Sequence, residues 1–459
     1  MNHNWSFMKP LAFLIAVSGL ALAQDQAKEH VLFAHDEVHE FHLRFEQPDW
    51  YQQMWTNFTA NGEDVPYIEA SFEWRDVKFA KVGVRIKGNS TARVNSIKKP
   101  FRIKFNEFTK GQKIDGIGSV NLNNCNLDPS MARELPYFEL AKAAGLKAPR
   151  MNYAALYINS EFYGLYFLGE VINDDYIKDH FVKDEEEGWL YKGDIGSTFE
   201  DKGDDKAPYK ATYEKKTYED EDDWSDLINL IAVLNRTPES ELAAEIEKVL
   251  DIDSFLTAMV LDNLTVNLDN YLGMSQNYYV YRRPTDNKFE WLVWDPSLAF
   301  GAFSGGMNTA QLKTLVLDWP GGTGVGGALP PGGPGGPGGA RSAARPLATK
   351  LWAIPAIKAR YIEIYRRLAS EVYDADAIIT RMNTLRDLIR PYVERDPNKL
   401  HTIEQFENAM TVEAAAPVPG IPGPGFPGAA APRGGSAPAL EPFLKERIAS
   451  VKAQLAELP

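Results

Sequence analysis

Hydrophobic and polar residues alternate along the first third of the chain, which is the pattern of strands with one buried face. The clearest runs are Glu40–Phe45, Ile68–Trp74, Lys78–Lys87 and Pro100–Phe105, and a further hairpin is expected over Ala154–Glu170. A helical or turn segment around Asp49–Trp55 separates the first two runs, and a polar loop from Gly88 separates the last two. Because short connections join antiparallel strands, we expect a mostly antiparallel sheet in this part of the protein.

Apolar residues return with helical spacing in the second half of the chain. An earlier helix is predicted from Asp128, an N-cap candidate, to Gly145, a C-terminal glycine. The segment Lys178–Asp223 is rich in Asp, Glu, Lys and Gly, so we expect a mobile surface insertion there, with a calcium site as the less favoured alternative. The later helices are expected over Asp226–Leu234, Glu239–Leu250, Ile252–Leu264, Ala348–Leu368, Ala375–Arg395 and Glu441–Leu458. The pattern predicts an α+β protein with a β-rich N-terminal lobe and a helical C-terminal lobe, and a cleft between two such lobes is a common place for a nucleotide.

Two low-complexity tracts interrupt the helical half. A Gly/Pro-rich loop is expected over residues 306–345, and a Pro/Gly/Ala-rich loop over residues 414–439. Neither composition can bury a core, so we expect both loops to be flexible. The helices beside them carry apolar faces that need partners. We therefore expect a core over residues 24–305 and a helical extension of the same domain over residues 346–459.

The first residues have the pattern of a secretory signal peptide over residues 1–23. Lys9 precedes an apolar run, Leu11–Leu22, and Ala21-Leu22-Ala23 fits a cleavage site before Gln24. The apolar run is too short to span a bilayer comfortably. We expect an exported protein that is secreted, periplasmic or held at the cell surface, with no transmembrane segment after cleavage. An uncleaved N-terminal anchor is the alternative.

Composition excludes several classes of partner and site. The 459-residue chain carries 63 Asp and Glu against 49 Lys and Arg, a formal charge of −14. Nucleic acids and anionic membranes bind basic surfaces, so this balance argues against both. Cys125 is the only cysteine, which excludes an internal disulfide. A zinc site is poorly supported as well, because a strand over Val38–Phe45 places His39 and His42 on opposite faces.

Three polar residues lie at the two ends of a predicted hairpin formed by residues 277–295. Asp269 and Asn277 precede its first strand, and Asp295 ends its second. Because the chain reverses between the strands, both ends should meet at one edge. Two carboxylates and an amide converging there suit phosphoryl transfer with magnesium. The alternative is that Asp269 belongs to a turn and Asp295 merely ends a strand.

Basic residues and one glutamate in the N-terminal half could complete such a site. Arg85 and Lys87 lie on a strand that runs into a small polar turn, whose backbone amides could approach phosphates. Arg102 and Lys104 lie opposite the apolar face of the next strand and could reach phosphates if they face a cleft. Glu134 lies in the predicted helix, where it could pair with a strand lysine. The alternatives are ordinary surface charges and a glutamate favoured by the helix dipole.

Taken in order, these residues lie in a chain that resembles the spore-coat protein H (CotH) kinase-like family. The resemblance covers most of residues 30–305 and, more thinly, the rest. No single segment is specific, but all of them in this order are a strong signal. The segments are Arg85-Ile86-Lys87-Gly88-Asn89-Ser90, Lys98–Phe105, Asn121-Leu122-Asn123, Asp128–Glu134, Gly145–Arg150, Tyr163–Tyr166 with Glu170, Leu190–Gly193, Asp269–Tyr279, Trp294-Asp295 with Gly301, and Phe443–Arg447.

The resemblance implies a two-lobed atypical protein kinase that uses ATP with Mg²⁺ or Mn²⁺ to phosphorylate Ser or Thr of extracytoplasmic or coat-type proteins. It makes Asp269 the catalytic aspartate near the acceptor hydroxyl, and Asn277 and Asp295 metal ligands. It makes Lys104 a phosphate contact paired with Glu134. Arg85, Lys87 and Arg102 are further phosphate candidates under the same resemblance.

One position departs from the family pattern. The family often has a second Asp two residues after the Trp-Asp pair, and this chain has Ser297 there. If that carboxylate holds the metal in the family, its loss weakens or abolishes activity. The alternative function is therefore a noncatalytic surface or coat protein, which uses the same fold for assembly or adhesion.

Overall fold

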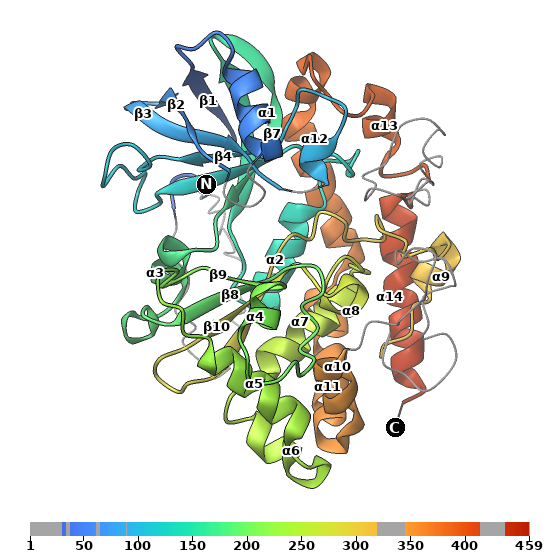
Figure 1. The fold of residues 1–459 in the computed structure, drawn as a ribbon. Helices are drawn as coiled ribbons and strands as arrows, with labels where there is room; N and C mark the ends of the chain where they lie inside the picture. The colour runs from blue at the N-terminus through green and yellow to red at the C-terminus, as the bar shows by residue number, and fades with distance from the viewer. Residues whose placement is uncertain are drawn as a thin grey trace, which may run out of the picture.

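Most strands of the N-terminal half close into a barrel in the computed structural model, which describes residues 30–33, 37–60, 65–88, 90–318, 345–413 and 437–458 (Figure 1). Within these residues the barrel order is β1-β2-β3-β4-β5-β7-β6. All neighbours are antiparallel except β1 and β6. The strands are β1 (Val38–Arg44), β2 (Ile68–Trp74), β3 (Val77–Ile86), β4 (Phe101–Lys104), β5 (Ser119–Asn123), β6 (Met151–Ile158) and β7 (Glu161–Glu170). The predicted signal peptide and most of both predicted loops lie outside the described residues.

Alternation along each strand separates the barrel core from its outer face. On β3, Val82, Val84 and Ile86 are fully buried with the apolar residues of the neighbouring strands. Since successive side chains point to opposite faces, Arg85 and Lys87 face outward. The outer face of β3, β4 and β5 therefore carries the polar residues.

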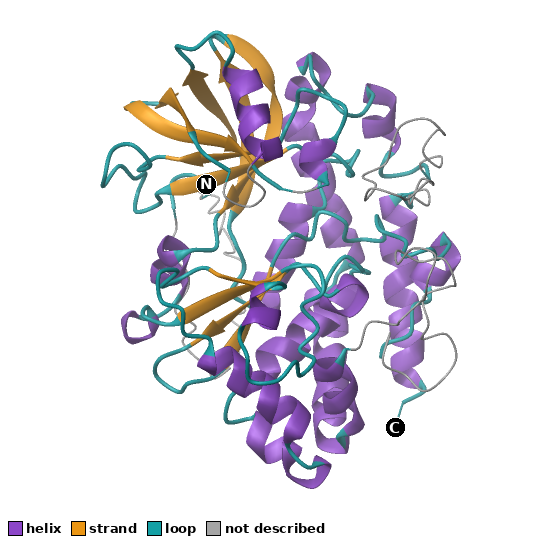
Figure 2. Cartoon of the chain, viewed as in Figure 1, coloured by secondary structure: helices purple, strands orange, loops and turns teal. Residues whose placement is uncertain are grey.

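A second sheet lies below the barrel and belongs to the C-terminal lobe (Figure 2). It consists of β8 (Trp189–Gly193), β9 (Tyr213–Lys215), β10 (Tyr278–Arg282) and β11 (Phe289–Val293), in the order β11-β10-β8-β9. The prediction of a surface insertion over residues 178–223 is wrong, because β8 and β9 come from this segment and Tyr191, Phe199 and Tyr213 are buried in the main core. The high content of charged residues in this segment concealed the apolar residues that pack in the core.

Helices surround this sheet and fill the lower lobe. Helices from both halves of the chain, including α2, α5, α7, α10, α11 and α14, share one hydrophobic core, so the segment after residue 345 packs against the residues before 305. The helical segments are α1 (Trp50–Ala60), η1 (Thr91–Arg93), α2 (Glu134–Ala144), α3 (Asp174–His180), η2 (Lys183–Glu185), α4 (Ala207–Lys210), α5 (Ser225–Arg236), α6 (Glu239–Ile246), α7 (Ile252–Leu264), α8 (Tyr271–Met274), α9 (Thr309–Lys313), α10 (Pro346–Ala353), α11 (Pro355–Arg367), η3 (Leu368–Val372), α12 (Ala375–Arg395), α13 (Ile403–Asn408) and α14 (Leu440–Ala456). No helix in the described part is long and apolar enough to cross a membrane.

Helix α2 starts later than predicted. The Asp128 carboxylate accepts hydrogen bonds from the backbone N–H groups of Ser130, Ala132 and Arg133, and it pairs with the Arg133 guanidinium. These contacts close residues 128–133 into a turn, so the helix begins at Glu134. As a result Glu134 lies at the first helical position.

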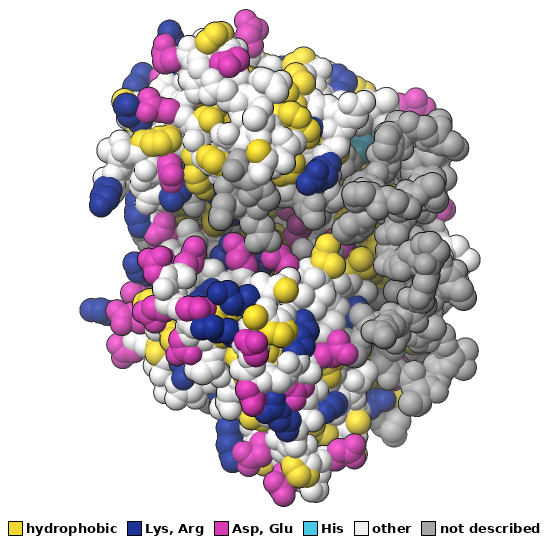
Figure 3. Space-filling model, viewed as in Figure 1, with side chains coloured by type: hydrophobic (Ala, Val, Ile, Leu, Met, Phe, Trp, Pro, Cys, Tyr) yellow, Lys and Arg dark blue, Asp and Glu magenta, His cyan; other side chains and the backbone are white. Residues whose placement is uncertain are grey.

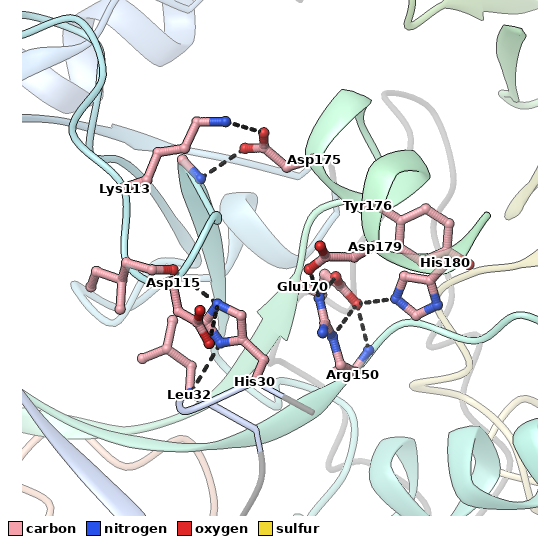
Figure 4. A network of polar contacts seen from close by, with 12 residues as sticks. His30, Leu32, Lys113, Asp115, Arg150, Glu170, Asp175, Tyr176, Asp179 and His180 are labelled. Atoms are coloured by element: carbon pink, nitrogen blue, oxygen red, sulfur yellow. Dashed lines mark hydrogen bonds and ion pairs between the residues drawn. The ribbon is translucent and has the colours of Figure 1, made fainter. Parts of the chain in front are cut away.

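A buried network of charged residues joins the barrel to the helix that follows it (Figure 4). Arg150 precedes β6, and its guanidinium binds Glu170 at the end of β7 and Asp179 in α3, at 2.8 Å from Nη2 to Oδ2 of Asp179. Nε2 of His180 lies 3.0 Å from Oε2 of Glu170. Helix α3 in turn packs against the second sheet, with Tyr176 beside Leu190, Tyr279 and Leu292 in one apolar cluster. The network therefore fixes the joint between the two lobes.

The predicted fold class is confirmed: the protein is α+β, with a β-rich N-terminal lobe and a helical C-terminal lobe.

Candidate functional site

Asp269 is held in place by the loop that follows α7. Nε2 of Gln276 lies 2.5 Å from Oδ1 of Asp269, and Nδ2 of Asn277 donates to Oδ2 of Asp269 at 3.1 Å and to its backbone oxygen at 2.7 Å. Asn277 has φ +60°, a left-handed conformation that residues other than glycine adopt at a cost. The loop thus fixes the carboxylate of Asp269 with two side-chain amides.

Asp295 lies at the same edge, two residues after β11. The register pairs Tyr278 with Val293, so the start of β10 meets the end of β11. Asp295 also has a positive φ, +50°, and its Oδ1 accepts a hydrogen bond of 2.8 Å from the Ser297 hydroxyl. The hairpin brings Asp269, Asn277 and Asp295 together, as its predicted chain reversal requires.

The two aspartates influence each other electrostatically. Burial and then the charge of Asp295 raise the pKa of Asp269 to about 7, although the amides of Gln276 and Asn277 act in the opposite direction. Among the described residues, no cation is an influence on the Asp269 pKa. Two buried carboxylates close together suit a bound cation, although Asp295 also interacts with Lys87.

A chain of contacts links Lys87, directly after β3, through Asn123 on β5 to Glu134 on α2. Nζ of Lys87 donates to Oδ1 of Asn123 at 2.7 Å, and Nδ2 of Asn123 donates to Oε2 of Glu134 at 3.0 Å. Burial lowers the pKa of Lys87 and raises that of Glu134, and Asp295 raises both. The amide of Asn123 thus connects a lysine and a glutamate that face Asp295.

The predicted pairing of Lys104 with Glu134 is wrong. Nζ of Lys104 lies 2.7 Å from Oε2 of Glu107, and the Lys104 side chain is 42% exposed. The register explains the error, because Lys104 pairs with Ser119, at the opposite end of β5 from Asn123. Four residues of strand separate those ends, about 13 Å. Lys87, at the near end of β3, contacts Asn123 instead.

The other two basic candidates, Arg85 and Arg102, contact different parts of the protein. Nη1 of Arg85 donates to the backbone oxygen of Val65 at 3.3 Å, and its guanidinium lies 5.0 Å from the centre of the Tyr67 ring. Nε of Arg102 donates to Oδ1 of Asn121 at 3.1 Å, and the charge of Arg102 lowers the pKa of Lys87. Arg102 therefore lies near the site, whereas Arg85 contacts residues just before β2.

Sequence reasoning missed the roles of Asn123 and Lys192. Both lie in segments that carry the family resemblance. Their contacts depend on the pairing of the strands, which the sequence alone does not show. The charge of Lys192, on β8, also lowers the pKa of Lys87. Figure 3 shows acidic and basic side chains side by side along the boundary between the two lobes.

The oxygen ligands fit magnesium or manganese only if other ligands complete the coordination. The described residues contain no group of three or more His, Cys, Asp or Glu able to hold a metal. Asp295 and the amide oxygen of Asn277 supply few ligands, but Mg²⁺ is commonly held by one or two carboxylates together with phosphate oxygens and water. The donor set therefore fits a metal that arrives with a nucleotide.

Residues 84–414 match the protein family described as CotH kinase protein. The chain is 22% identical to the inner spore coat protein H of Bacillus subtilis over 304 residues, 65% of this chain and 75% of that protein. It is 27% identical to the invasin CotH3 of Rhizopus delemar over 190 residues, 39% of this chain and 31% of the invasin. The chain thus matches three quarters of the first relative's length but about a third of the second's.

A solved structure also matches, though weakly. The Helicobacter pylori proinflammatory kinase CtkA is 10% identical and covers 74% of this chain and 91% of its own, with a TM-score of 0.26. The low TM-score means that this similarity carries no argument about the site.

Proposed function

Because the chain belongs to the CotH kinase protein family, we propose that it is an exported atypical protein kinase, which transfers the γ-phosphate of ATP to Ser or Thr of extracytoplasmic or coat-type proteins. The observation that carries the proposal is the convergence of residues from both lobes. Asp269, Asn277 and Asp295 meet at one edge of the second sheet, and the charge of Asp295 acts on Lys87 after β3 and on Glu134 in α2.

Asp269 is proposed to orient the acceptor hydroxyl and accept its proton. The hydroxyl oxygen forms a bond to the γ-phosphorus while the bond from that phosphorus to the bridging oxygen of ADP breaks. Gln276 and Asn277 hold the carboxylate of Asp269 through their side-chain N–H groups. This arrangement leaves the amide oxygen of Asn277 for a metal ligand.

Lys87 is proposed to contact the phosphates, in the role that the resemblance gave to Lys104. Asn123 accepts a hydrogen bond from Lys87 and donates one to Glu134, and this chain of contacts is proposed to orient Lys87. Asp295 and Asn277 would hold Mg²⁺ or Mn²⁺, which supplies charge neutralisation at the phosphate oxygens when bound. Arg102 is a further phosphate contact in this proposal, and Arg85 and Lys104 are peripheral.

A second candidate function is a noncatalytic coat or surface protein, and Ser297 favours it. Its hydroxyl donates to Asp295 and brings no negative charge, so the site has one carboxylate fewer than the family pattern. Two relatives carry the names of a spore coat protein and an invasin. The same fold would then serve assembly or adhesion.

Thermal unfolding separates the two functions. The mature chain is melted with ATP, with Mg²⁺ or Mn²⁺, and with both, beside Asp295→Ala. A kinase site predicts a rise in melting temperature that needs nucleotide and metal together and disappears in the variant, because a ligand that binds only the folded state stabilises it. No rise at millimolar nucleotide in a folded sample would favour the noncatalytic function.

A further inference from the structure

Lys192 lies on β8 of the second sheet, which belongs to the C-terminal lobe. In the register of the second sheet it pairs with Tyr279 on β10, two residues after Asn277. Paired residues of neighbouring strands point to the same face. Tyr279 packs with α3 and with Trp294 on the face of the sheet toward the barrel, so Lys192 points to this face as well.

The aromatic residues beside Lys192 lead to Lys87. The ring centres of Tyr279 and Trp294 are 5.7 Å apart, and Nζ of Lys87 lies 6.0 Å from the centre of the Trp294 ring. Trp294 directly precedes Asp295. Lys87 therefore lies near one ring of this aromatic pair and Lys192 is paired with the residue that carries the other, next to the proposed metal ligand.

Arg102 adds a third cation. Burial lowers the pKa of Lys87 most, and the charges of Arg102 and Lys192 lower it further. Two lysines and an arginine thus converge from different lobes. Like charges in a half-buried space repel one another, and an anion between them removes that cost.

Although burial lowers the pKa of Lys192, Tyr279 and two acidic partners, Asp194 and Glu214, raise it overall. Oδ1 of Asp194 lies 2.5 Å from Nζ of Lys192, and Oε2 of Glu214 lies 3.9 Å away. The side chains of Lys192 and Asp194 are 26% and 34% exposed, and ion pairs that water reaches contribute little stability. Lys216 also binds Glu214, so this carboxylate is shared. Lys192 therefore keeps its positive charge beside the aspartates of the site.

We propose that Lys192 is a second nucleotide-binding lysine, which contacts the phosphate chain from the C-terminal lobe while Lys87 contacts it from the barrel. This inference rests on the proposed function. It deepens that function, because a phosphate chain held by both lobes links the barrel to the second sheet.

The test compares Lys192→Met and Lys192→Arg with Lys210→Met. Lys210 is an exposed lysine of the same lobe whose Nζ lies 3.0 Å from Oδ1 of Asp222. Affinities of the full chain for ATP with Mg²⁺ and for adenosine are measured by calorimetry, after the melting temperature of each unliganded variant has confirmed folding. We expect Lys192→Met to weaken ATP binding roughly tenfold or more, the size of one lost charge-assisted contact. Lys192→Arg should recover part of the affinity, and Lys210→Met should bind like the parent.

The outcomes distinguish this inference from the proposed function. ATP binding by Lys192→Met equal to that of the parent would overturn the inference and leave the kinase site standing. Equal weakening for ATP and adenosine would place Lys192 at the nucleoside and overturn the phosphate contact. A parent that binds no ATP with metal would overturn the proposed function itself. If Lys192→Met does not fold, the Lys192→Arg variant tests the inference alone. An affinity of Lys192→Arg for ATP equal to that of the parent, together with a parental affinity for adenosine, would contradict a phosphate contact that depends on the position of the ammonium group.

Discussion

Two buried charge networks of this protein differ in how well their charges are balanced. At the joint between the lobes, burial acts to raise the pKa of Glu170, but His180 and Arg150 outweigh it and the pKa falls to about 2. At the candidate functional site, burial and Asp295 together raise the pKa of Asp269 to about 7. The pKa of Glu134 is also raised, and that of Lys87 is lowered.

The difference separates a structural network from a functional one. At the joint the fold stabilises the charged form of its glutamate, and the partners for that charge are built into the protein. At the candidate functional site the fold disfavours the charged forms of two acids, Asp269 and Glu134, and of Lys87. Charges buried at a cost are typical of sites whose counter-charge arrives with a ligand. The predictions below test this contrast.

The largest effect is expected for Asp269→Ala. Transfer of the γ-phosphate should fall by about 10³-fold or more, because the acceptor hydroxyl loses its base, while nucleotide binding persists. Radiolabelled transfer to a generic protein acceptor measures the first effect, and the ATP-dependent rise in melting temperature measures the second. Equal transfer by parent and variant would remove Asp269 from the catalytic role.

The next effect concerns stability and compares the two networks directly. Glu170→Gln should destabilise the protein by about 3–5 kcal/mol, because it breaks a buried ion pair and leaves a charge without its partner. Glu134→Gln should cause no such loss in the unliganded protein, because folding already disfavours the ionised form of Glu134. Urea unfolding measures both variants.

The exposed pair of Glu139 with Arg381 provides a matched control for these variants. Glu139→Gln should change the unfolding free energy by less than about 1 kcal/mol. If Glu134→Gln lowered the unfolding free energy as much as Glu170→Gln does, the two networks would not differ in the way proposed.

The balance at the joint also predicts a dependence of stability on pH. The pKa of Glu170 is lowered in the folded protein, so its contribution is fully present above its ordinary value of 4.5 and is lost as the pH falls toward 2. The shift corresponds to about 3 kcal/mol. The difference in unfolding free energy between the parent and Glu170→Gln should therefore shrink between pH 5 and pH 2.5. A constant difference over this range would contradict the assignment.

The sequence predicted the parts of the site that depend on short-range chain reversal. Asp269, Asn277 and Asp295 lie around one hairpin, and a turn of a few residues is enough to bring its ends together. The outward position of Lys87 followed from alternation along one strand. Such features need no knowledge of distant partners.

Features that depend on distant pairing could not be predicted. Lys87 and Lys104 both lie on outward faces of strands, and only the register of β4 on β5 shows that Lys104 is far from Asn123. The late start of α2 depends on the turn closed by Asp128. The segment with β8 was misjudged because average composition concealed the short strand that places Lys192.

The smallest effect is expected for Asn123, whose amide connects Lys87 to Glu134. Asn123→Ala removes the acceptor of Lys87 and a donor to Glu134, so the lysine loses its fixed position. We expect KM for ATP to rise roughly tenfold, about 1.4 kcal/mol, with a smaller change in kcat. Steady-state kinetics with varied ATP measure both constants.

A buried amide elsewhere in the barrel separates this positioning role from general packing. Nδ2 of Asn152 on β6 lies 3.3 Å from the backbone oxygen of Leu32, and neither residue belongs to the proposed site, so Asn152→Ala should lower stability with an unchanged KM. The double variant Asn123→Asp with Glu134→Gln exchanges the acid and the amide while keeping the total charge. If Asn123 acts by connecting Lys87 to position 134, the double variant should bind ATP better than the sum of its single variants predicts, because each change supplies the partner that the other removes. Additive losses, or the same rise in KM for Asn152→Ala, would show that Asn123 only fills space.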